Sequence, residues 1–358
     1  MTSLVDLKEF TQDELERLVA SWGQPPYRAR QLQKWLYKGI FDFEQMTDLS
    51  KDFRHQLARK AMISRLTLAD QQHSEDGSEK FGFALADGRR IESVLIPEDD
   101  HLTLCLSTQV GCAQGCHFCL TAQQGLTRNL TAAEIVNQVL EVRARLRQDQ
   151  KLSNLVFMGM GEPLANFNNT LKALTILTAS WGLDFSARRV TVSTVGLAPQ
   201  IIQLGNAIRV NLAVSLNAPD DPTRSRLMPV NRCYPLAVLL DACRAFPLPG
   251  HRRITFTYVL LKGINDSPTQ ARQLARLLRG LRAKINLIPF NPHPSLPFER
   301  PSEAAILAFQ EILLSAHYTT LIRKTRGLDI VAACGQLAGT APVSKQNLSP
   351  LRANPATL

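Results

Sequence analysis

The sequence predicts an α/β protein whose main part is an open, partial (β/α)6 barrel, preceded by a small N-terminal helical domain and a β-hairpin extension. From residue 130 onward, short apolar runs alternate with helical patterns of roughly 10–15 residues, which is typical of parallel strands joined by crossover helices. About six such units are too few to close an eight-stranded barrel, so we expect an open sheet with its functional loops at the carboxyl ends of the strands.

Four segments follow from this pattern. Residues 1–65 form a helical accessory domain, residues 66–100 a β-hairpin linker or extension, residues 101–340 the partial barrel, and residues 341–358 a disordered tail. In the first segment, Thr11 and Glu14 form a capping box that opens a helix. A second helix, residues 28–37, mixes basic and aromatic side chains. This mixture fits a nucleic-acid platform, and it fits equally well a small domain with a solvated basic face.

The composition indicates an ordinary soluble globular protein. The chain has 358 residues, 45% hydrophobic and 20% charged. No apolar run is long enough to cross a membrane, and the N-terminus has no secretion signal. We therefore expect a cytoplasmic protein whose seven cysteines serve metal or redox chemistry rather than structural disulfides. The net charge of +10 favours a polyanionic partner such as RNA or DNA.

Residues 66–108 change to a strand pattern. Apolar runs predict strands at 81–85, 91–96 and 102–107, with a turn at 86–89 between the first two. Glu92 lies in the middle of the second run, where a carboxylate is costly unless it is paired or used. The simpler interpretation of Glu92 alone is an outward-facing strand residue.

The barrel elements continue to residue 323. A capping box at Thr131 and Glu134 opens a helix along Ile135 and Leu146. Further strands are predicted at residues 155–158, 189–194, 210–215, 254–261, 285–289 and 320–323, and helices at 168–181, 236–246, 269–281 and 302–317.

Several polar or small residues fall at or just past the ends of these strands: Gly161, Glu162, Ser193, Ser215, Leu216, Asn217 and Asn291. The carboxyl ends of parallel strands meet at one mouth, so these residues should converge there. A glycine turn lets the backbone approach a ligand, and Glu162 could accept from an ammonium group. Each residue alone could simply end a strand, as small and polar residues often do, but together they favour a cofactor site.

The most informative stretch is the loop that holds Cys112, Cys116 and Cys119. Three thiolates are too few for a closed tetrahedral zinc site and leave one thiol over in a disulfide set. An iron–sulfur cluster normally takes four cysteine ligands, so three protein cysteines leave one iron open. The spacing, with Phe118 before the last cysteine, resembles the radical S-adenosylmethionine (SAM) superfamily, in which SAM chelates the open iron.

Four cysteines lie outside this loop. Cys334 sits in a small-sided alanine- and glycine-rich stretch after the basic run 323–326, which could hold phosphates near its sulfur. Cys105 lies at the end of a predicted strand. Either one alone is more simply an idle or buried thiol. Cys233 and Cys243 lie in or beside an apolar helix and are predicted to be buried core thiols.

The chain resembles the RlmN/Cfr family of radical SAM RNA methyltransferases almost from end to end. The resemblance is carried by residues 26–29, 46–49, 112–119, 121–125, 128–130, 159–164, 286–292, 323–327 and 333–337. It implies a radical SAM barrel in which Cys112, Cys116 and Cys119 hold one 4Fe-4S cluster, and the strand-end residues named above contact SAM.

The resemblance also implies a mechanism that uses two SAM molecules per turnover. The first methylates the sulfur of Cys334. The second is cleaved to a radical that takes a hydrogen atom from this methyl group, and the resulting methylene radical adds to carbon 2 of an adenine. Cys105 then resolves the protein–RNA adduct by forming a transient disulfide with Cys334. Glu92 occupies the position of the proton acceptor.

The implied substrates are 23S rRNA in the peptidyl transferase region and tRNA at the adenosine beside the anticodon. The implied partners are an electron donor such as flavodoxin or ferredoxin, and no membrane, with the protein acting as a monomer. Two alternatives stay open: methylation of carbon 8 of the adenine, and a non-enzymatic iron–sulfur or zinc protein that binds RNA. The presence of both Cys105 and Cys334 argues against the second. Three residues depart from the family pattern: Asn217 replaces a histidine, and Leu328 and Val331 replace polar residues.

Overall fold

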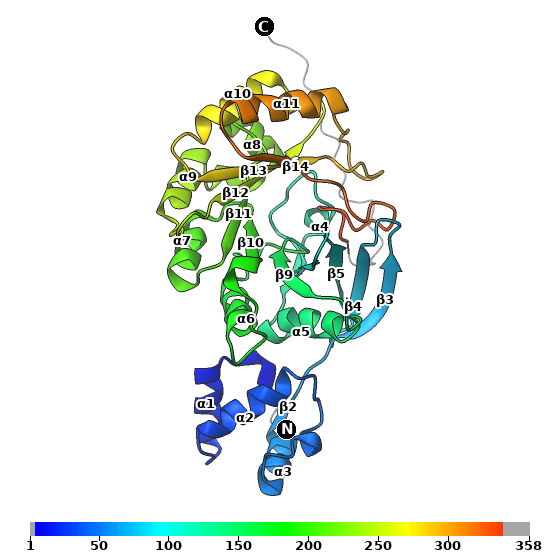
Figure 1. The fold of residues 1–358 in the computed structure, drawn as a ribbon, viewed down its shortest axis with the longest axis vertical. Coiled ribbons are helices and arrows are strands. Elements are labelled where there is room, and N and C mark those ends of the chain that lie inside the picture. The colour runs from blue at the N-terminus through cyan, green and yellow to red at the C-terminus, as the bar shows by residue number, and fades with distance from the viewer. Residues whose placement is uncertain (1–3, 339–358) are drawn as a thin grey trace.

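The computed structural model describes residues 4–338, so the predicted tail at 341–358 lies outside the described residues. Within residues 4–338, ten strands form one sheet in the order β14-β13-β12-β11-β10-β9-β6-β5-β4-β3 (Figure 1). Its two edges, β14 and β3, do not pair with each other in this described part of the chain. The predicted open α/β barrel is therefore confirmed.

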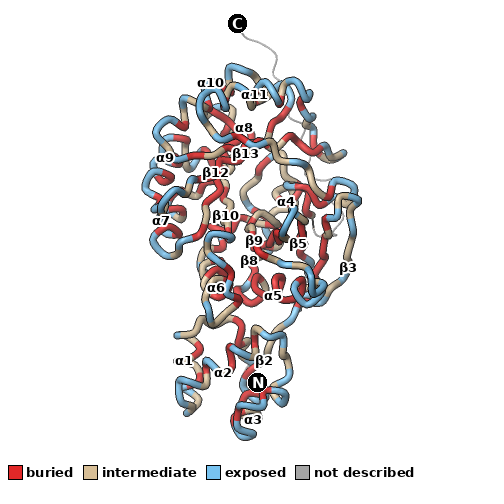
Figure 2. The backbone as a smooth tube through the Cα atoms, viewed as in Figure 1, coloured by how far each residue is buried: buried red, intermediate tan, exposed pale blue. Residues whose placement is uncertain are grey.

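The parallel part of the sheet runs from β6 to β14. Its strands are β6 (Leu102–Cys105), β9 (Leu152–Phe157), β10 (Val190–Thr194), β11 (Asn211–Ser215), β12 (Ile254–Leu260), β13 (Ala283–Pro289) and β14 (Thr320–Ile322). The helices between them are α5 (Ala132–Arg143), α6 (Phe167–Thr178), α7 (Ala198–Ala207), α8 (Asp221–Leu227), α9 (Leu236–Ala245), α10 (Pro268–Leu277) and α11 (Glu303–Ser315). Buried residues are concentrated on the strands, which form the centre of the main core (Figure 2).

Local sequence signals explain where several helices begin. The Thr131 hydroxyl accepts from the backbone N–H of Glu134, whose side chain accepts in return, and α5 starts there as predicted. Ser267 and Gln270 form the same motif at α10. The sequence did not predict α7 or α8, because α7 is short and mostly apolar and α8 carries arginines among polar residues.

The segment before β6 is larger than the predicted hairpin. It forms three antiparallel strands, β3 (Thr67–His73), β4 (Glu79–Ala84) and β5 (Arg90–Pro97), and β5 pairs with β6 so that the main sheet continues through them. We expected two strands here. The third, β3, is polar and partly exposed because it is the edge of the sheet, so it lacks the apolar alternation that reveals a strand.

The N-terminal residues form a separate helical unit with its own core. It contains β1 (Val5–Asp6), η1 (Leu7–Glu9), α1 (Gln12–Ser21), α2 (Tyr27–Leu36), η2 (Phe43–Gln45), α3 (Lys51–Lys60) and β2 (Ala61–Met62). In Figure 1 this unit lies at one end of the molecule, beside α5 and α6. The Glu9 carboxylate accepts from the backbone N–H groups of Ala132 and Ala133 at the start of α5. Lys8 Nζ donates to Asn137 Oδ1 at 2.7 Å. The N-terminal unit thus supplies acceptors for two N–H groups at the start of α5, in addition to the Thr131 cap.

None of the helices in residues 4–338 has the length and apolar character needed to cross a membrane.

Candidate active site

A two-stranded ribbon closes the cysteine loop at its base. The strands β7 (Gln109–Gly111) and β8 (Leu126–Asn129) pair on either side of the loop and of the short helix α4 (Leu120–Gln123). Gly111 has a φ of +76°, and a Cβ at this position would lie 1.9 Å from the carbonyl oxygen of Gly125. Only glycine fits this crossing. The backbone N–H of Cys112 donates to the same Gly125 oxygen at 2.9 Å, which fixes the start of the loop.

The three loop cysteines lie together and are withdrawn from solvent. Cys112 and Cys116 are buried and Cys119 is half-buried. Burial raises the pKa of all three thiols, that of Cys112 to about 12. The other loop cysteines raise the pKa of Cys112 and Cys116 further, and Cys334 does so for Cys119. No three His, Cys, Asp or Glu side chains in residues 4–338 surround a point suited to a single metal ion. A 4Fe-4S cluster does not require such a point, because three thiolates bind three different irons. The donor set therefore fits this cluster.

Most of the predicted cofactor residues line one cavity of about 160 Å³ beside this loop. Its predicted members are Cys112, Cys119, Gly161, Glu162, Ser193, Ser215, Asn217, Asn291 and Cys334. They come from the cysteine loop, from the carboxyl ends of the barrel strands and from the C-terminal segment, as the mouth of a barrel requires. Leu216, Cys116, Cys105 and Glu92 do not line it. Leu216 is fully buried, and its backbone N–H donates to Thr257 O on β12.

Glu162 is the buried carboxyl group of this cavity. Its Oε1 accepts from the N–H of Leu164 at 3.0 Å and its Oε2 from the N–H of Val195 at 2.8 Å. Burial raises the pKa of Glu162 to about 7, although hydrogen bonds from Val195, Leu164 and Thr194 oppose the shift. A carboxyl group held in this way can receive an ammonium group when it is ionised.

Asn217 lines the cavity in a conformation that suits asparagine. Its φ is +58°, a left-handed value that asparagine tolerates better than most residues. Its Oδ1 accepts from the N–H of Val259 at 2.8 Å and its Nδ2 donates to the sulfur of Met228 at 3.1 Å. The Asn217 side chain is thus already engaged with β12 and with Met228 at the end of α8.

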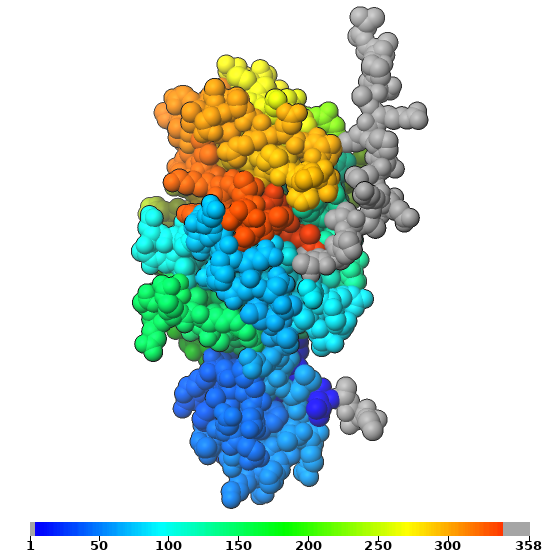
Figure 3. Space-filling view, turned by 90° about the vertical axis from the view of Figure 1, so that its right-hand side faces the viewer, coloured from blue at the N-terminus to red at the C-terminus, as the bar shows by residue number. Residues whose placement is uncertain are grey.

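The segment that carries Cys334 is held on two sides. On one side it is bound to α4 and its flanks: Leu120 N donates to Gly335 O at 2.8 Å, Thr121 Oγ1 donates to Leu337 O, and Gln124 Nε2 donates to Ala338 O. On the other side it lies against the antiparallel strands β3–β5, as Figure 3 shows.

The contacts to these strands come from residues that are distant in sequence. Gly327 N donates to Asp76 Oδ2 at 2.8 Å, and Ser74 Oγ donates to Asp329 Oδ1 at 2.5 Å. Lys80 Nζ donates to Ile330 O at 2.6 Å. The strands that appeared to be a linker therefore position the exposed thiol of Cys334. Sequence reasoning missed Lys80, Asp76 and Ser74, since nothing local in the sequence links them to residues 327–338.

Glu92 is buried, so the interpretation of an outward-facing residue is wrong. Its Oε2 accepts from the N–H of Ala338 at 3.0 Å, and its Oε1 lies 3.9 Å from Lys80 Nζ. A buried carboxylate needs such partners. Glu92 and Lys80 thus form a charged pair beneath the segment that carries Cys334.

Cys105 lies at the end of β6, buried, and close enough to Cys334 that the charge of Cys334 acts on it. Burial raises the pKa of Cys105 to about 12, with a further contribution from Cys334 and an opposing one from Arg323. Both thiols are free, so no disulfide joins them here. Among the remaining cysteines, Cys243 is buried as predicted, but Cys233 is exposed, because it ends the short 3-10 helix η4 (Pro229–Arg232) at the surface.

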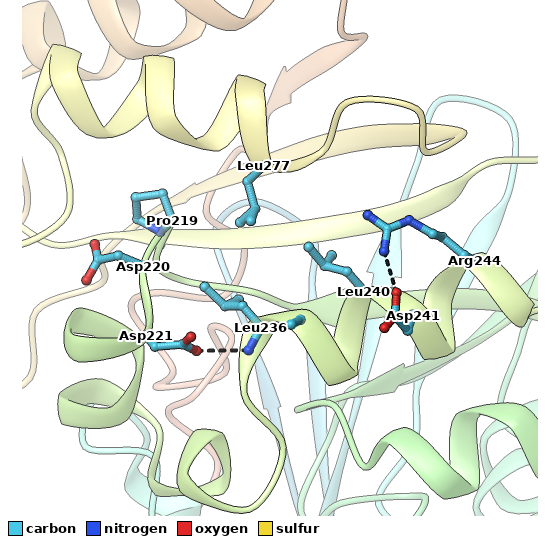
Figure 4. A pocket seen from close by; sticks show the side chains of 9 residues that line it. Pro219, Asp220, Asp221, Leu236, Leu240, Asp241, Arg244 and Leu277 are labelled. Atoms are coloured by element: carbon cyan, nitrogen blue, oxygen red, sulfur yellow. Dashed lines mark hydrogen bonds and ion pairs between the residues drawn. The ribbon is translucent and has the colours of Figure 1, made fainter.

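A second hollow, of about 410 Å³, lies between α8, α9 and α10 (Figure 4). Its polar groups are engaged with one another: Asp221 accepts from the N–H of Leu236 at 2.8 Å, and Arg244 donates to Asp241 at 2.5 Å. It contains no cysteine and none of the predicted site residues. The cysteine-lined cavity is therefore the candidate active site.

The fold and the cysteine loop define a radical SAM protein. The Radical SAM superfamily model matches residues 106–275, and the model of the ribosomal RNA large subunit methyltransferase N-terminal domain matches residues 5–63. The chain belongs to the RlmN family. It is 54% identical over 340 residues to the dual-specificity RNA methyltransferase RlmN of Geobacter sulfurreducens, covering 95% of this chain and 93% of that protein.

Two further comparisons agree. The dual-specificity RNA methyltransferase RlmN of Syntrophus aciditrophicus is 52% identical over 338 residues, covering 94% of this chain and 97% of that protein. The crystal structure of a radical SAM methyltransferase from Sphaerobacter thermophilus superposes with a TM-score of 0.87 at 47% identity, covering 94% of this chain and 99% of that one.

Proposed function

We propose that this protein is a radical SAM methyltransferase that modifies carbon 2 of adenosine in 23S rRNA and in tRNA beside the anticodon. The observation that carries the proposal is the position of Cys334 and Cys105 relative to the three cysteines of the loop. Cys334 lines the same cavity as Cys112 and Cys119. Cys105 lies buried at the end of β6, where the charge of Cys334 contributes to its raised pKa. A purely structural metal site would not require Cys105 and Cys334. The names of the relatives support RNA as the substrate.

The cofactors would be held by residues already described. Cys112, Cys116 and Cys119 would bind one 4Fe-4S cluster, and SAM would lie in the cavity against Gly161, Glu162, Ser193, Ser215 and Asn291, with Asn217 and the Leu216 backbone shaping its wall. Bound there, they would supply the methyl group and the carbon radical, with two SAM molecules used per turnover. The cofactors carry this chemistry, and the protein positions the reactants.

Within this scheme the protein's thiols have separate tasks. Cys334 accepts the methyl carbon on its sulfur and later links it to the adenine. Glu92, beside the same segment, takes the proton that carbon 2 must lose, and the one electron that the adduct radical must also lose would return to the bound cluster. Cys105 then attacks the Cys334 sulfur: the sulfur–carbon bond to the RNA breaks, a disulfide forms, and the released carbon keeps the electron pair and gains a proton. Because Cys105 is buried with a raised pKa, a base is needed to ionise it.

The remaining parts fit an RNA substrate. Residues 1–65 would form the RNA-binding domain, with residues 66–100 bracing the reactive segment and residues 101–340 the catalytic barrel. A target adenine must leave its stack to reach the cavity, which suits loops of folded RNA. The reductant would be a small electron-transfer protein such as flavodoxin or ferredoxin, and the enzyme would act as a cytoplasmic monomer.

Nucleoside mass spectrometry tests the proposal. Reconstituted anaerobically with SAM, reductant and rRNA or tRNA, the protein should yield 2-methyladenosine, whereas 8-methyladenosine would show the alternative carbon-8 activity. The Cys105→Ala variant should accumulate a covalent protein–RNA adduct that persists on a denaturing gel, because the thioether cannot be resolved. Cys233→Ala, which removes an exposed thiol elsewhere, should turn over normally. Formation of no 5′-deoxyadenosine by the wild-type protein would contradict the enzymatic function.

A further inference from the structure

Arg224, on helix α8, is the largest fully buried side chain of the protein as far as the structure describes it. Its sequence context, Asp-Pro-Thr-Arg-Ser-Arg, is polar and would be expected at the surface. The neighbouring Arg226 is indeed exposed. A buried cation is expensive unless it is paired and hydrogen-bonded, so the position of Arg224 requires an explanation.

The guanidinium group of Arg224 binds only neutral acceptors. Its Nε donates to Leu216 O at 3.1 Å, and one terminal nitrogen donates to Asn231 Oδ1 at 2.8 Å. The other terminal nitrogen donates to Val195 O at 2.6 Å and to Ser215 O at 3.2 Å. Among residues 4–338, no carboxylate lies within ion-pair distance of it; Asp221 is reached only through Asn231, whose Nδ2 donates to Asp221 Oδ1 at 2.9 Å. These four bonds engage four of the five N–H donors of the group. Within the described chain no carboxylate contacts the group directly, and the charge of Asp221 acts on it only from beyond hydrogen-bond distance.

The geometry places this charge behind the cysteine loop. The N–H of His117 donates to Leu227 O at 3.0 Å, so α8 lies directly against the loop. Leu227 and Cys116 share one apolar cluster. The charges of Arg224 and Cys116 act on each other, and Cys116 is the strongest influence that raises the pKa of the guanidinium. Arg224 does not line the cavity, so it touches neither SAM nor RNA there.

The surrounding sequence makes room for this arrangement. Gly196, with a φ of +111°, lies so close that a Cβ would sit 3.2 Å from a terminal nitrogen of Arg224. The burial of Arg224 lowers its pKa to about 10, which still leaves the group charged at neutral pH. The chain thus maintains a permanent positive charge in a region of low dielectric constant, where its field is screened little.

We propose that Arg224 is a positioning residue that acts as the fixed counter-charge of the iron–sulfur cluster and raises its reduction potential. The inference rests on the proposed ligation of the cluster by Cys116. Thiolate ligands give a bound cluster net negative charge, and reduction adds one more electron. A buried cation next to one ligand stabilises the reduced state more than the oxidised state, and charge near a cluster is one of the factors that set its potential. Reduction of the cluster must precede radical formation, so Arg224 would make that step easier.

An EPR-monitored redox titration of the reconstituted full-length protein tests this role without any RNA. In Arg224→Gln the ratio of reduced to oxidised cluster at a fixed potential should fall about tenfold, which for a one-electron couple is a shift of 59 mV to lower potential. Arg224→Lys keeps the charge and should recover most of the wild-type value. Arg226→Gln removes an exposed charge from the same helix and should leave the potential unchanged.

A second variant tests the proposal independently in case Arg224→Gln folds poorly. Asn231→Asp leaves the arginine in place but puts a carboxylate on the acceptor 2.8 Å from it, so the field of the guanidinium is neutralised. The potential should again fall. Unchanged potentials in both Arg224→Gln and Asn231→Asp would overturn the proposal, as would an equal fall in Arg224→Lys, which would indicate a purely structural role. A failure to methylate carbon 2 would leave these potentials unaffected, whereas a wild-type protein that takes up no iron would overturn the cluster assignment and this role with it.

Discussion

The backbone N–H of Leu120 donates to the carbonyl oxygen of Gly335 at 2.8 Å. Leu120 follows the last cysteine of the loop, and Gly335 follows Cys334. One hydrogen bond therefore ties the segment that would hold the iron–sulfur cluster to the segment that would carry the methyl group. More than two hundred residues separate these segments in sequence, and the contact fixes their relative position at the mouth of the barrel.

The conformation of Gly335 should be critical for this contact. Its φ is +82°, and a Cβ would lie 3.5 Å from Phe118 O, so there is space for a methyl group but the backbone conformation disfavours it. Gly335→Ala should cost about 1–2 kcal/mol of stability and displace Cys334, lowering the methylation rate by up to roughly a hundredfold. Iron content should be unchanged. Gly250, with a φ of +56° and open space around it, is the matched control: Gly250→Ala should have a similar effect on stability and none on activity. Equal activities of the two variants would contradict the prediction.

Lys80 should matter more than its place in a β-strand suggests. It donates to Ile330 O and lies 3.9 Å from Glu92 Oε1. Lys80→Met should cost roughly 1–3 kcal/mol, because it leaves a half-buried carbonyl oxygen and a buried carboxylate without this partner, and it should lower kcat. Chemical denaturation and single-turnover methylation would measure both effects. Lys151→Met, at an exposed lysine, serves as the control. If Lys80 acts through Glu92, the double variant with Glu92→Gln should be non-additive; strict additivity would argue that the two side chains act separately.

Glu162 should make the stability of the cluster-free protein depend on pH in an unusual direction. Its pKa is raised from 4.5 to about 7 by burial. The folded protein therefore binds more protons than the unfolded chain between these values, so the contribution of Glu162 is full below pH 4.5 and is lost as the pH rises through about 7. The ionisation of Glu162 should therefore lower the denaturant midpoint as the pH rises from about 4.5 to about 7. Glu162→Gln does not titrate, so the difference between its midpoint and that of the wild type should change with pH over this window. A pH-independent difference would refute the prediction.

Val331 is an avoidable source of strain. It has a φ of +52°, a conformation that a β-branched residue rarely adopts, in the segment that leads to Cys334. Val331→Asn should raise the free energy of unfolding by about 1 kcal/mol, since asparagine tolerates left-handed backbone far better. Val238→Asn, at an exposed valine in helix α9, should change stability little because the two residues have similar helix propensities. Thermal or chemical unfolding of the pair would decide whether strain is present.

Sequence predicted the parallel part of the fold because the strands from β9 to β14 are short and apolar, and helical patterns follow β9, β11, β12 and β13. It also predicted that the candidate site residues converge, because Cys112, Cys116 and Cys119 form a local motif and strand ends meet in any parallel barrel. The placement of Glu162, Ser193 and Asn291 around one cavity follows from topology alone.

Other features depend on contacts that no local pattern encodes. Strand β3 is polar because it is an edge, so its sequence looks like a loop. Lys80 reaches Ile330 across 250 positions of the chain. Arg224 lies in a polar stretch that would be expected at the surface, yet its guanidinium group lies between the ends of β10 and β11. In each case the tertiary environment, rather than local propensity, determines the role of the residue.

Glu9 has a consequence for how this protein can be divided. Its carboxylate caps α5, a helix of the barrel, although Glu9 itself belongs to the N-terminal unit. The boundary between two recognisable sequence families therefore does not coincide with a boundary between independent bodies. In a barrel expressed alone, the N–H groups of Ala132 and Ala133 would lose these acceptors and would have to bind water instead.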